Sequence, residues 1–250
     1  MEKKRKIVVT LSGGMDSAVL LFKAAKIADE VHTISFDYGQ RHRRELDCVE
    51  KQLADVKSLY PDKVFHNKLL DTTFIREMAP VSSLTNDGID TPNVKDMMGE
   101  AQPKSYVPFR NLMFLSMLCS YAEAVDAHEV WYGAAQADSL AGYWDGSEEF
   151  VNQLNTVTAL NRENRITVTA PLIEMSKKDI VLDGVSLGVN FSHTYTCYSG
   201  EYPCDAESAS SSLRLQGFVE AKLRDPVEYK QQDKLEVVYR ENECMSITRS

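Results

Sequence analysis

The sequence has few cysteines, and they do not follow the pattern of a disulfide framework. There are five, an odd and scattered set: Cys48, Cys119, Cys197, Cys204 and Cys244. No apolar stretch is long enough to cross a membrane, and the N-terminus lacks the pattern of a signal peptide. Because thiols stay reduced in the cytoplasm, these absences favour a cytoplasmic protein without a membrane partner.

Excess positive charge is also absent. The chain has 28 Lys and Arg residues against 37 Asp and Glu residues, which gives a formal net charge of −9. An enzyme that binds tRNA usually presents a broad basic surface, so this balance disfavours a nucleic acid as partner. With 250 residues, 43% of them hydrophobic, the chain can bury the core of one α/β domain with a small appendage.

The first loop is the most informative stretch of the chain. It follows the apolar residues 7–9, precedes a helical pattern, and reads Leu11-Ser12-Gly13-Gly14-Met15-Asp16-Ser17. Paired glycines let the backbone approach a ligand, and the N–H groups of a first helical turn favour a phosphate. No Gly-Lys-Ser/Thr follows, so the loop is not a Walker A motif. The plain alternative is a strand-to-helix turn with Asp16 or Ser17 as N-cap.

The complete Ser-Gly-Gly-x-Asp-Ser string resembles the PP-loop of the ATP pyrophosphatases. Those enzymes cleave ATP between its α and β phosphates and pass AMP to a substrate oxygen. The resemblance implies that this loop holds the pyrophosphate of ATP. The predicted ATP-binding residues are Leu11, Ser12, Gly13, Gly14, Met15, Asp16, Ser17, Phe36 and Tyr38.

Strand-like and helix-like segments alternate along the chain. Strands are predicted at residues 7–11, 31–37, 63–69, 128–133 and 166–170, and helices at residues 16–28, 44–60, 111–126, 146–161 and from 177. This alternation predicts βαβ units and therefore an α/β fold with a doubly wound, mostly parallel sheet. Residues 80–105 are predicted to form a lid or binding loop, and residues 235–239 form a strand-like run.

Polar residues beyond the predicted strand ends are the site candidates, because ligands of such sheets bind there. Arg110 and Lys177 stand at predicted helix starts where they can bind phosphate, and with Asp16 they are the predicted catalytic residues. The predicted substrate-binding residues are Gln40, Arg41, Asp138, Tyr143 and Asp145. The alternative for each is a solvated charge, a helix cap or a packed aromatic ring.

Several strings together resemble one family, the 7-cyano-7-deazaguanine synthases, or QueC enzymes of the queuosine pathway. They occur in matching order at residues 11–17, 36–42, 107–111, 114–116, 142–145, 171–180, 194–198, 213–214 and 217–218. The resemblance implies an adenine nucleotide alpha hydrolase-like fold, usually homodimeric, that uses ATP and Mg²⁺. It further implies adenylation of the carboxylate of 7-carboxy-7-deazaguanine and attack by ammonia to give an amide, which a second activation dehydrates to the nitrile.

The resemblance also implies a PP-loop ATP-pyrophosphatase domain over residues 1–190 and a C-terminal region over residues 191–250. In that region the family carries four zinc cysteines. Here Cys197 matches the first of these cysteines, and Ser208 and Ser211 stand where two others are expected. Asp205 stands at the one remaining position, and Cys204 lies one residue before it. Neutral serines are poor zinc ligands, so Cys197 and Cys204 are the remaining metal candidates and a four-thiolate site cannot form.

A second departure lies near the expected base pocket. Where the family has Tyr-Pro-Asp-Cys-Arg, residues 143–147 read Tyr-Trp-Asp-Gly-Ser, without the arginine. Two enzymatic hypotheses follow: a ligase that forms the amide or nitrile of the deazaguanine, or a relative of the QueC-like members of anti-phage (CBASS-type) operons. The latter would stop at the amide and join the deazaguanine to a protein amine.

Two further hypotheses do not require this ligase reaction. One is a nucleotide-binding pseudoenzyme that acts as a regulator, and the unaltered loop at residues 11–17 argues against it. The other is thiolation of tRNA, which the acidic net charge and the absence of a suitable CxxC pair disfavour.

Overall fold

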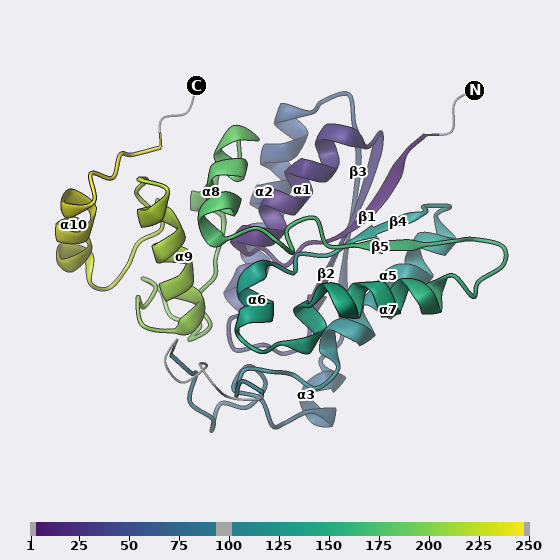
Figure 1. Cartoon of the computed structure of the whole chain (residues 1–250), viewed down its shortest axis with the longest axis horizontal. Helices are drawn as coiled ribbons and strands as arrows, with labels where there is room; N and C mark the ends of the chain where they lie inside the picture. Colours follow the sequence, from purple (N-terminus) through teal and green to yellow (C-terminus); the bar gives the residue numbers. More distant parts are fainter. Residues whose placement is uncertain (1–3, 94–101, 248–250) are drawn as a thin grey trace.

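The computed structural model describes residues 4–93 and 102–247 (Figure 1). A five-stranded sheet with the order β3-β2-β1-β4-β5 forms the centre, and every neighbouring pair in it is parallel. The strands are β1 (Lys6–Thr10), β2 (Glu30–Asp37), β3 (Val64–Asp71), β4 (Glu129–Trp131) and β5 (Thr167–Thr169). The predicted α/β class and doubly wound parallel sheet are therefore confirmed.

Helices cover both faces of this sheet (Figure 1). On one face lie α1 (Met15–Ile27), α2 (Leu46–Leu59) and α8 (Lys177–Ser186), and on the other lie α5 (Arg110–Ala124) and α7 (Glu148–Thr158). Side chains alternate along a strand, so in β1 Ile7 and Val9 pack with the first set and Val8 with the second. Burial on both faces explains why β1 is continuously apolar in sequence.

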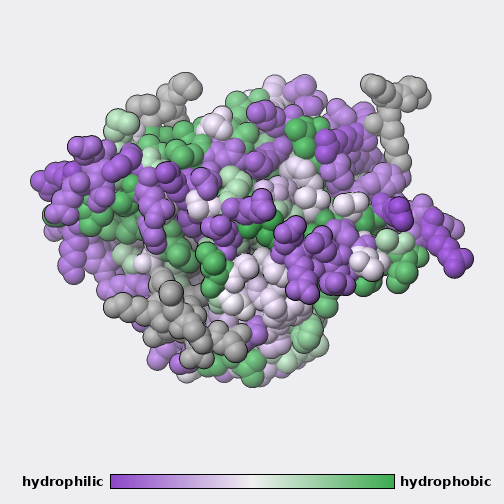
Figure 2. All heavy atoms as spheres, viewed as in Figure 1, coloured by the Kyte–Doolittle hydropathy of each residue, from purple (hydrophilic) through white to green (hydrophobic). Residues whose placement is uncertain are grey.

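The remaining elements are short or lie near the C-terminus. They are η1 (Arg43–Glu45), α3 (Phe74–Met78), α6 (Gln136–Leu140), η2 (Trp144–Gly146), η3 (Phe191–His193), α9 (Ala209–Glu220) and α10 (Gln232–Glu241). A third hydrophobic cluster joins the segment that begins at Tyr195 to α10. In Figure 2 hydrophilic residues cover most of the end of the molecule where α10 lies. No helix within residues 4–93 and 102–247 is long and apolar enough to cross a membrane.

The structure differs from the sequence prediction near the C-terminus. The interpretation of residues 235–239 as strand-like is wrong, because these residues belong to helix α10 (Gln232–Glu241). Leu235 and Tyr239, four residues apart, are buried on one face, whereas Val237 between them is 47% exposed, and this spacing is that of an amphipathic helix. The predicted loop at 80–105 is described only in part, because residues 94–101 lie outside the described residues. Within the described part, Thr85 is buried.

The strand order fixes where a ligand can bind. From β1 the chain moves outward to β2 and β3 and then returns to the other side of β1 for β4. Loops leaving β1 and β4 in opposite directions open a crevice beyond the carboxyl ends of the strands. The loop at residues 11–14 and the segment at residues 133–135 meet at this place.

Candidate active site

Contacts from distant segments hold the loop after β1 in one conformation. Gly13 has a φ of +93°, and a Cβ there would lie 1.8 Å from the carbonyl oxygen of Glu45. The Gly13 carbonyl accepts hydrogen bonds from the Tyr195 backbone N–H at 3.0 Å and from Gln52 Nε2 at 2.8 Å. Only glycine fits this position, which explains the first glycine of the pair.

The N-terminus of α1 is left open toward the crevice. Gly14 is the N-cap and no side chain caps it, so the predicted alternative with Asp16 or Ser17 as N-cap is wrong. Ser17 instead donates its hydroxyl to the Gly14 carbonyl at 3.1 Å and accepts from the Ser12 N–H at 3.2 Å. The N–H groups of an uncapped first turn, together with the helix dipole, favour a bound anion.

Lys177 and Asp16 form an ion pair across this opening. Lys177 Nζ lies 2.6 Å from Asp16 Oδ2, with side chains 15% and 23% exposed. Ser176 and Asp179 form the capping box at the start of α8. Burial alone would lower the pKa of Lys177, but Asp16 and Asp138 outweigh burial and raise it, so the amine stays charged.

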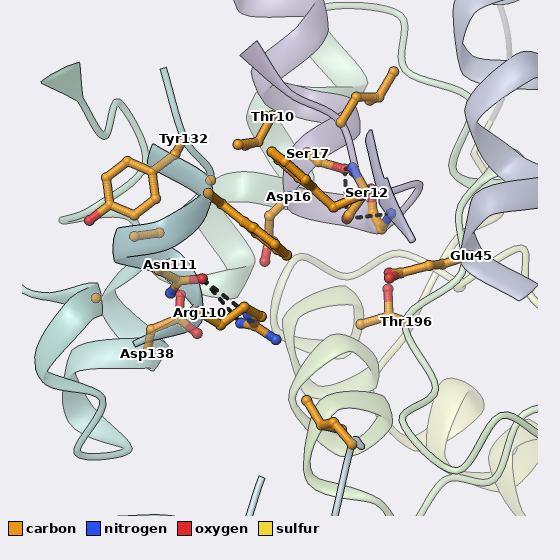
Figure 3. Close-up of a pocket in the computed structure, with 18 of the residues that line it drawn as sticks. Thr10, Ser12, Asp16, Ser17, Glu45, Arg110, Asn111, Tyr132, Asp138 and Thr196 are labelled. Carbon is orange, nitrogen blue, oxygen red and sulfur yellow. Dashed lines mark hydrogen bonds between the residues drawn. The ribbon is translucent and has the colours of Figure 1, made fainter. Parts of the chain in front are cut away.

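A cavity of about 240 Å³ lies beyond the strand ends, and all of the predicted ATP-binding residues except Gly13 line it. Figure 3 shows Asp16, Arg110 and Asp138 directed into the same space. Phe36 stacks on Phe114 with ring centroids 3.8 Å apart, and this pair forms an apolar wall.

Arg110 stands at the start of α5, after Phe109, whose φ of 55° is left-handed. Its Nη1 donates to the hydroxyl of Tyr38 at 3.0 Å, and its Nε and Nη2 donate to Asn111 Oδ1 at 3.3 and 3.2 Å. Burial raises the pKa of Tyr38 to about 12 although Arg110 opposes the shift, so this hydroxyl is neutral. The guanidinium is thus held in the cavity wall by two polar neighbours without a short ion pair to any described residue.

Two carboxylates lie at the other side of the cavity. Burial raises the pKa of both Asp138 and Asp145, and the charge of Arg110 opposes the shift at Asp145. Asp138 Oδ2 accepts from the Ala135 N–H at 2.8 Å. Asp145 Oδ1 is buried and has no hydrogen-bond partner among the described residues. An unpaired buried carboxylate oxygen is costly, which favours a ligand N–H donor beside it.

The structure does not bring two of the predicted substrate residues to the cavity. Gln40 is buried and accepts from the Tyr38 N–H at 2.9 Å, so it shapes the turn after β2. Arg41 donates to Thr91 Oγ1 at 3.0 Å and to the carbonyls of Asn86 and Ile89 at 3.2 and 3.1 Å, which anchors the loop at 82–93. Both residues lie after the end of β2, as the sequence predicts, but their side chains do not point into the cavity.

Other cavity residues were not among the predicted site residues. Ser105 accepts or donates a hydrogen bond with the Tyr143 hydroxyl, and Tyr195, Thr196 and Tyr198 enter from the C-terminal region. In the sequence, residues 194–198 carry part of the family resemblance and the metal candidate Cys197, and no ATP or substrate contact was predicted for them. Their contact with the loop after β1 is long-range, and no local pattern signals it.

The segment where the family implies zinc is filled by hydrogen bonds. The Asp205 carboxylate accepts from the Cys197 thiol at 2.9 Å, from the Ser199 hydroxyl and from the Ser208 backbone N–H at 2.6 Å. The Ser208 hydroxyl donates to the Ser211 hydroxyl at 3.0 Å. Two neutral hydroxyls already bonded to each other do not make a zinc ligand pair, so the residues present do not fit a structural zinc ion.

Within the described residues, one group of three His, Cys, Asp or Glu side chains has its ligand atoms close together. It is Glu30, His32 and His66, which lie near the amino ends of β2 and β3, away from the cavity at the carboxyl ends of the strands. The two imidazole rings stack at 4.4 Å with an angle of 20° between them. His32 Nε2 and His66 Nε2 lie 2.9 and 3.1 Å from Glu30 Oε1, so both nitrogens are already engaged by the carboxylate and the group is a hydrogen-bonded cluster around Glu30.

Comparison of the sequence with known proteins supports a nucleotide site at the loop after β1. The sequence profile of the family described as "Queuosine biosynthesis protein QueC" matches residues 6–222. The chain belongs to the QueC family. This QueC chain is 37% identical over 227 residues to 7-cyano-7-deazaguanine synthase 1 of Colwellia psychrerythraea, covering 90% of this chain and 98% of that protein. It is 39% identical over 235 residues to the 7-cyano-7-deazaguanine synthase of Thermoplasma acidophilum, covering 92% and 93%.

A solved structure shares the fold of this QueC chain. A 4-thiouridine synthetase in complex with RNA and bound ATP matches with a TM-score of 0.51 and 16% identity. The match covers 96% of this chain and 53% of that one. At this identity the likeness shows the fold alone, and the fold is that of the PP-loop family that the first loop predicted.

Proposed function

We propose that this QueC-family protein is an ATP-dependent ligase that adenylates the carboxylate of 7-carboxy-7-deazaguanine for attack by a nitrogen nucleophile. The product is the amide or, after a second activation, the nitrile 7-cyano-7-deazaguanine. The observation that carries the proposal is the buried Asp16 Oδ1, which lacks a partner among the described residues. It lies beside the charged Lys177 at the open N-terminus of α1, where a metal-bound polyphosphate fits.

The chemistry requires a good leaving group, because a carboxylate oxygen does not leave as oxide. ATP supplies AMP for that oxygen, and bound Mg²⁺ would supply charge for the pyrophosphate that departs. In our proposal Asp16 holds the metal, while the N–H groups at residues 14–17 and Lys177 bind the pyrophosphate oxygens. The apolar wall of Phe36 and the hydroxyl of Tyr38 face the nucleoside.

The same cavity offers complementary groups for the second substrate. A deazaguanine is flat, has N–H donors on one edge and carries its carboxylate on the other side. The unpaired Asp145 Oδ1 can accept from the N–H edge, and Arg110 can bind the carboxylate or the phosphate of the adenylate. Tyr143 also lines the cavity and is proposed to contact the ring.

Pyrophosphate release tests the proposal. The purified protein is incubated with ATP, Mg²⁺, 7-carboxy-7-deazaguanine and ammonium chloride, and products are identified by mass. We expect release that depends on the carboxylate, together with the amide or nitrile product. Without pyrophosphate release or ATP–pyrophosphate exchange in the presence of the carboxylate, the proposal is wrong.

A variant then tests the substrate site. Asp145→Asn should raise KM for the carboxylate about tenfold and leave KM for ATP within about twofold, since one charged hydrogen bond to the ring is weakened. Asp62→Asn, an exposed residue outside the cavity, is the matched control and should behave as the wild type. Equal changes in both KM values would place Asp145 outside ring recognition.

A further inference from the structure

A second, smaller hollow of about 70 Å³ adjoins the main cavity. Both share Asp16, Asp138 and Thr196 in their walls, so the hollow meets the cavity where the ion pair of Lys177 lies. Its outer walls come from α6 and α9, which are far apart in sequence. The inner end of the hollow also reaches Tyr143, so it opens into the cavity on the side where the deazaguanine ring is proposed to bind.

Small or partly exposed side chains line the outer part of the hollow. Ala137 and Ala141 come from the α6 side, and Ser210 and Leu213 come from α9; all four are partly exposed. The hollow thus leads from the surface between α6 and α9 to Asp138. A water needs about 10–15 Å³ of such space, so the hollow admits a few molecules of that size but no nucleotide.

The charges in the hollow favour a small cation. Lys177 is paired with Asp16 at 2.6 Å, and Arg214 is paired with Asp225 through contacts of 2.7 and 2.9 Å. Asp138 forms no ion pair with any residue of the described ranges, and its Oδ2 is bonded to a backbone N–H. Burial raises its pKa, and the nearby charge of Lys177, which is paired with Asp16, opposes this shift only in part.

We propose that this hollow is the entry and binding site of ammonium as the nitrogen nucleophile, with Asp138 as the group that holds it. This inference rests on the proposed function. Asp138 accepts one proton from ammonium, and the freed nitrogen lone pair forms the C–N bond to the acyl carbon. The C–O bond to the phosphate breaks, AMP leaves with the electron pair, and the extra proton on nitrogen passes to the AMP phosphate.

Activation and transfer can be measured separately, so an effect on the ammonium site can be distinguished from an effect on activation. Activation is measured as ATP–pyrophosphate exchange with the carboxylate, and transfer as amide formation against ammonium chloride concentration at constant ionic strength. Ala141→Leu narrows the entrance and should raise KM for ammonium about fivefold, with exchange within about twofold of wild type. Ala159→Leu, the same change at an exposed residue outside both cavities, is the matched control and should leave both unchanged.

Asp138→Asn provides the second variant. We expect KM for ammonium to rise at least about tenfold and amide formation to fall more than exchange, while the thermal midpoint stays near that of the wild type. An equal loss of exchange and transfer in both variants, or normal ammonium saturation in both, would overturn the inference.

The wild type itself distinguishes two further outcomes. Exchange without any ammonium-dependent amide, together with an acyl adduct on a protein amine in intact-mass analysis, would also overturn the ammonium site but leave the proposed activation in place. Absence of both exchange and pyrophosphate release with the carboxylate would instead remove the proposed function.

Discussion

Lys177 Nζ lies 2.6 Å from Asp16 Oδ2, so the first residue of α8 is tied to the first turn of α1, 161 positions away in the chain. A lysine at a helix start opposes the helix dipole, and the aspartate compensates for it. Asp16 lines the cavity and Lys177 lines the smaller hollow beside it, so the pair keeps a charged amine at the loop where phosphate is proposed to bind.

This relationship gives the first prediction. Lys177→Ala should lower kcat/KM for ATP about 100-fold, since a charge directed at the departing pyrophosphate is lost. The free energy of unfolding should fall by less than about 1 kcal/mol, because a partly exposed ion pair contributes little. Urea denaturation and pyrophosphate release measure the two quantities, with the exposed neighbour Lys178→Ala as control. If stability and turnover fall in proportion, the lysine is structural.

The first loop gives the second prediction. Gly13→Ala should lower the free energy of unfolding by about 2 kcal/mol or more, because its φ is +93° and its Cβ would lie 1.8 Å from the Glu45 carbonyl. Gly14→Ala has an ordinary φ of −77°, and its nearest contact would be Ser12 Oγ at 3.2 Å. Urea denaturation should show a much larger loss of unfolding free energy for Gly13→Ala than for Gly14→Ala. A reversed order would contradict the structure.

The sequence predicted the sheet well because its central strands are short apolar runs separated by amphipathic helices. β1 and β2 begin within one residue of their predicted starts. The error at residues 235–239 arose where β-branched valines coincided with a helical spacing of buried residues, Leu235 and Tyr239, that only tertiary packing reveals. Propensity is overridden when packing selects another period.

The site was predictable only where a local motif encodes it. Residues 11–17 form one turn, so their pattern is complete in sequence, and a strand end predicts the nearby edge of a crevice. That rule gives no side-chain direction, so it placed Arg41 in the site although this residue bonds to the loop at 86–91. Thr196 and Tyr198 also line the cavity, and they are held there by α9, because Arg214 Nη1 donates to Thr196 Oγ1 at 3.2 Å and the Tyr198 N–H donates to Ser210 Oγ at 3.1 Å. No spacing in the sequence shows these contacts.

The third prediction concerns pH and Asp205. Burial alone would raise the pKa of this carboxyl, but hydrogen bonds from Cys197, Ser199 and Ser208 outweigh burial and lower it to about 2, from 3.8. Because the folded pKa is depressed, the stabilisation is fully present above the unfolded pKa and is lost as pH falls toward 2. The shift corresponds to about 2 kcal/mol.

Urea denaturation at several pH values measures this effect. The stability difference between wild type and Asp205→Asn should shrink as pH falls from about 4 to about 2. Asp62→Asn, an exposed aspartate, controls for the general loss of stability in acid. A difference that does not change with pH would show that the Asp205 carboxylate is not stabilised by these bonds.

The last prediction concerns metal content. Ser208 and Ser211 hydrogen-bond to each other beside the Asp205 and Cys197 pair, so the wild type should contain no stoichiometric zinc after purification, and EDTA should leave its thermal midpoint unchanged. Ser208→Cys/Ser211→Cys adds two thiols to Cys197 and Cys204 and should bind about one zinc ion per chain, which EDTA would remove with a fall in thermal midpoint. Elemental analysis measures the zinc, and Ser208→Cys/Ser212→Cys, with one thiol misplaced along α9, is the matched control. Stoichiometric zinc in the wild type would mean that the thiols and Asp205 suffice as ligands, and equal zinc in both double variants would mean that position within α9 does not matter.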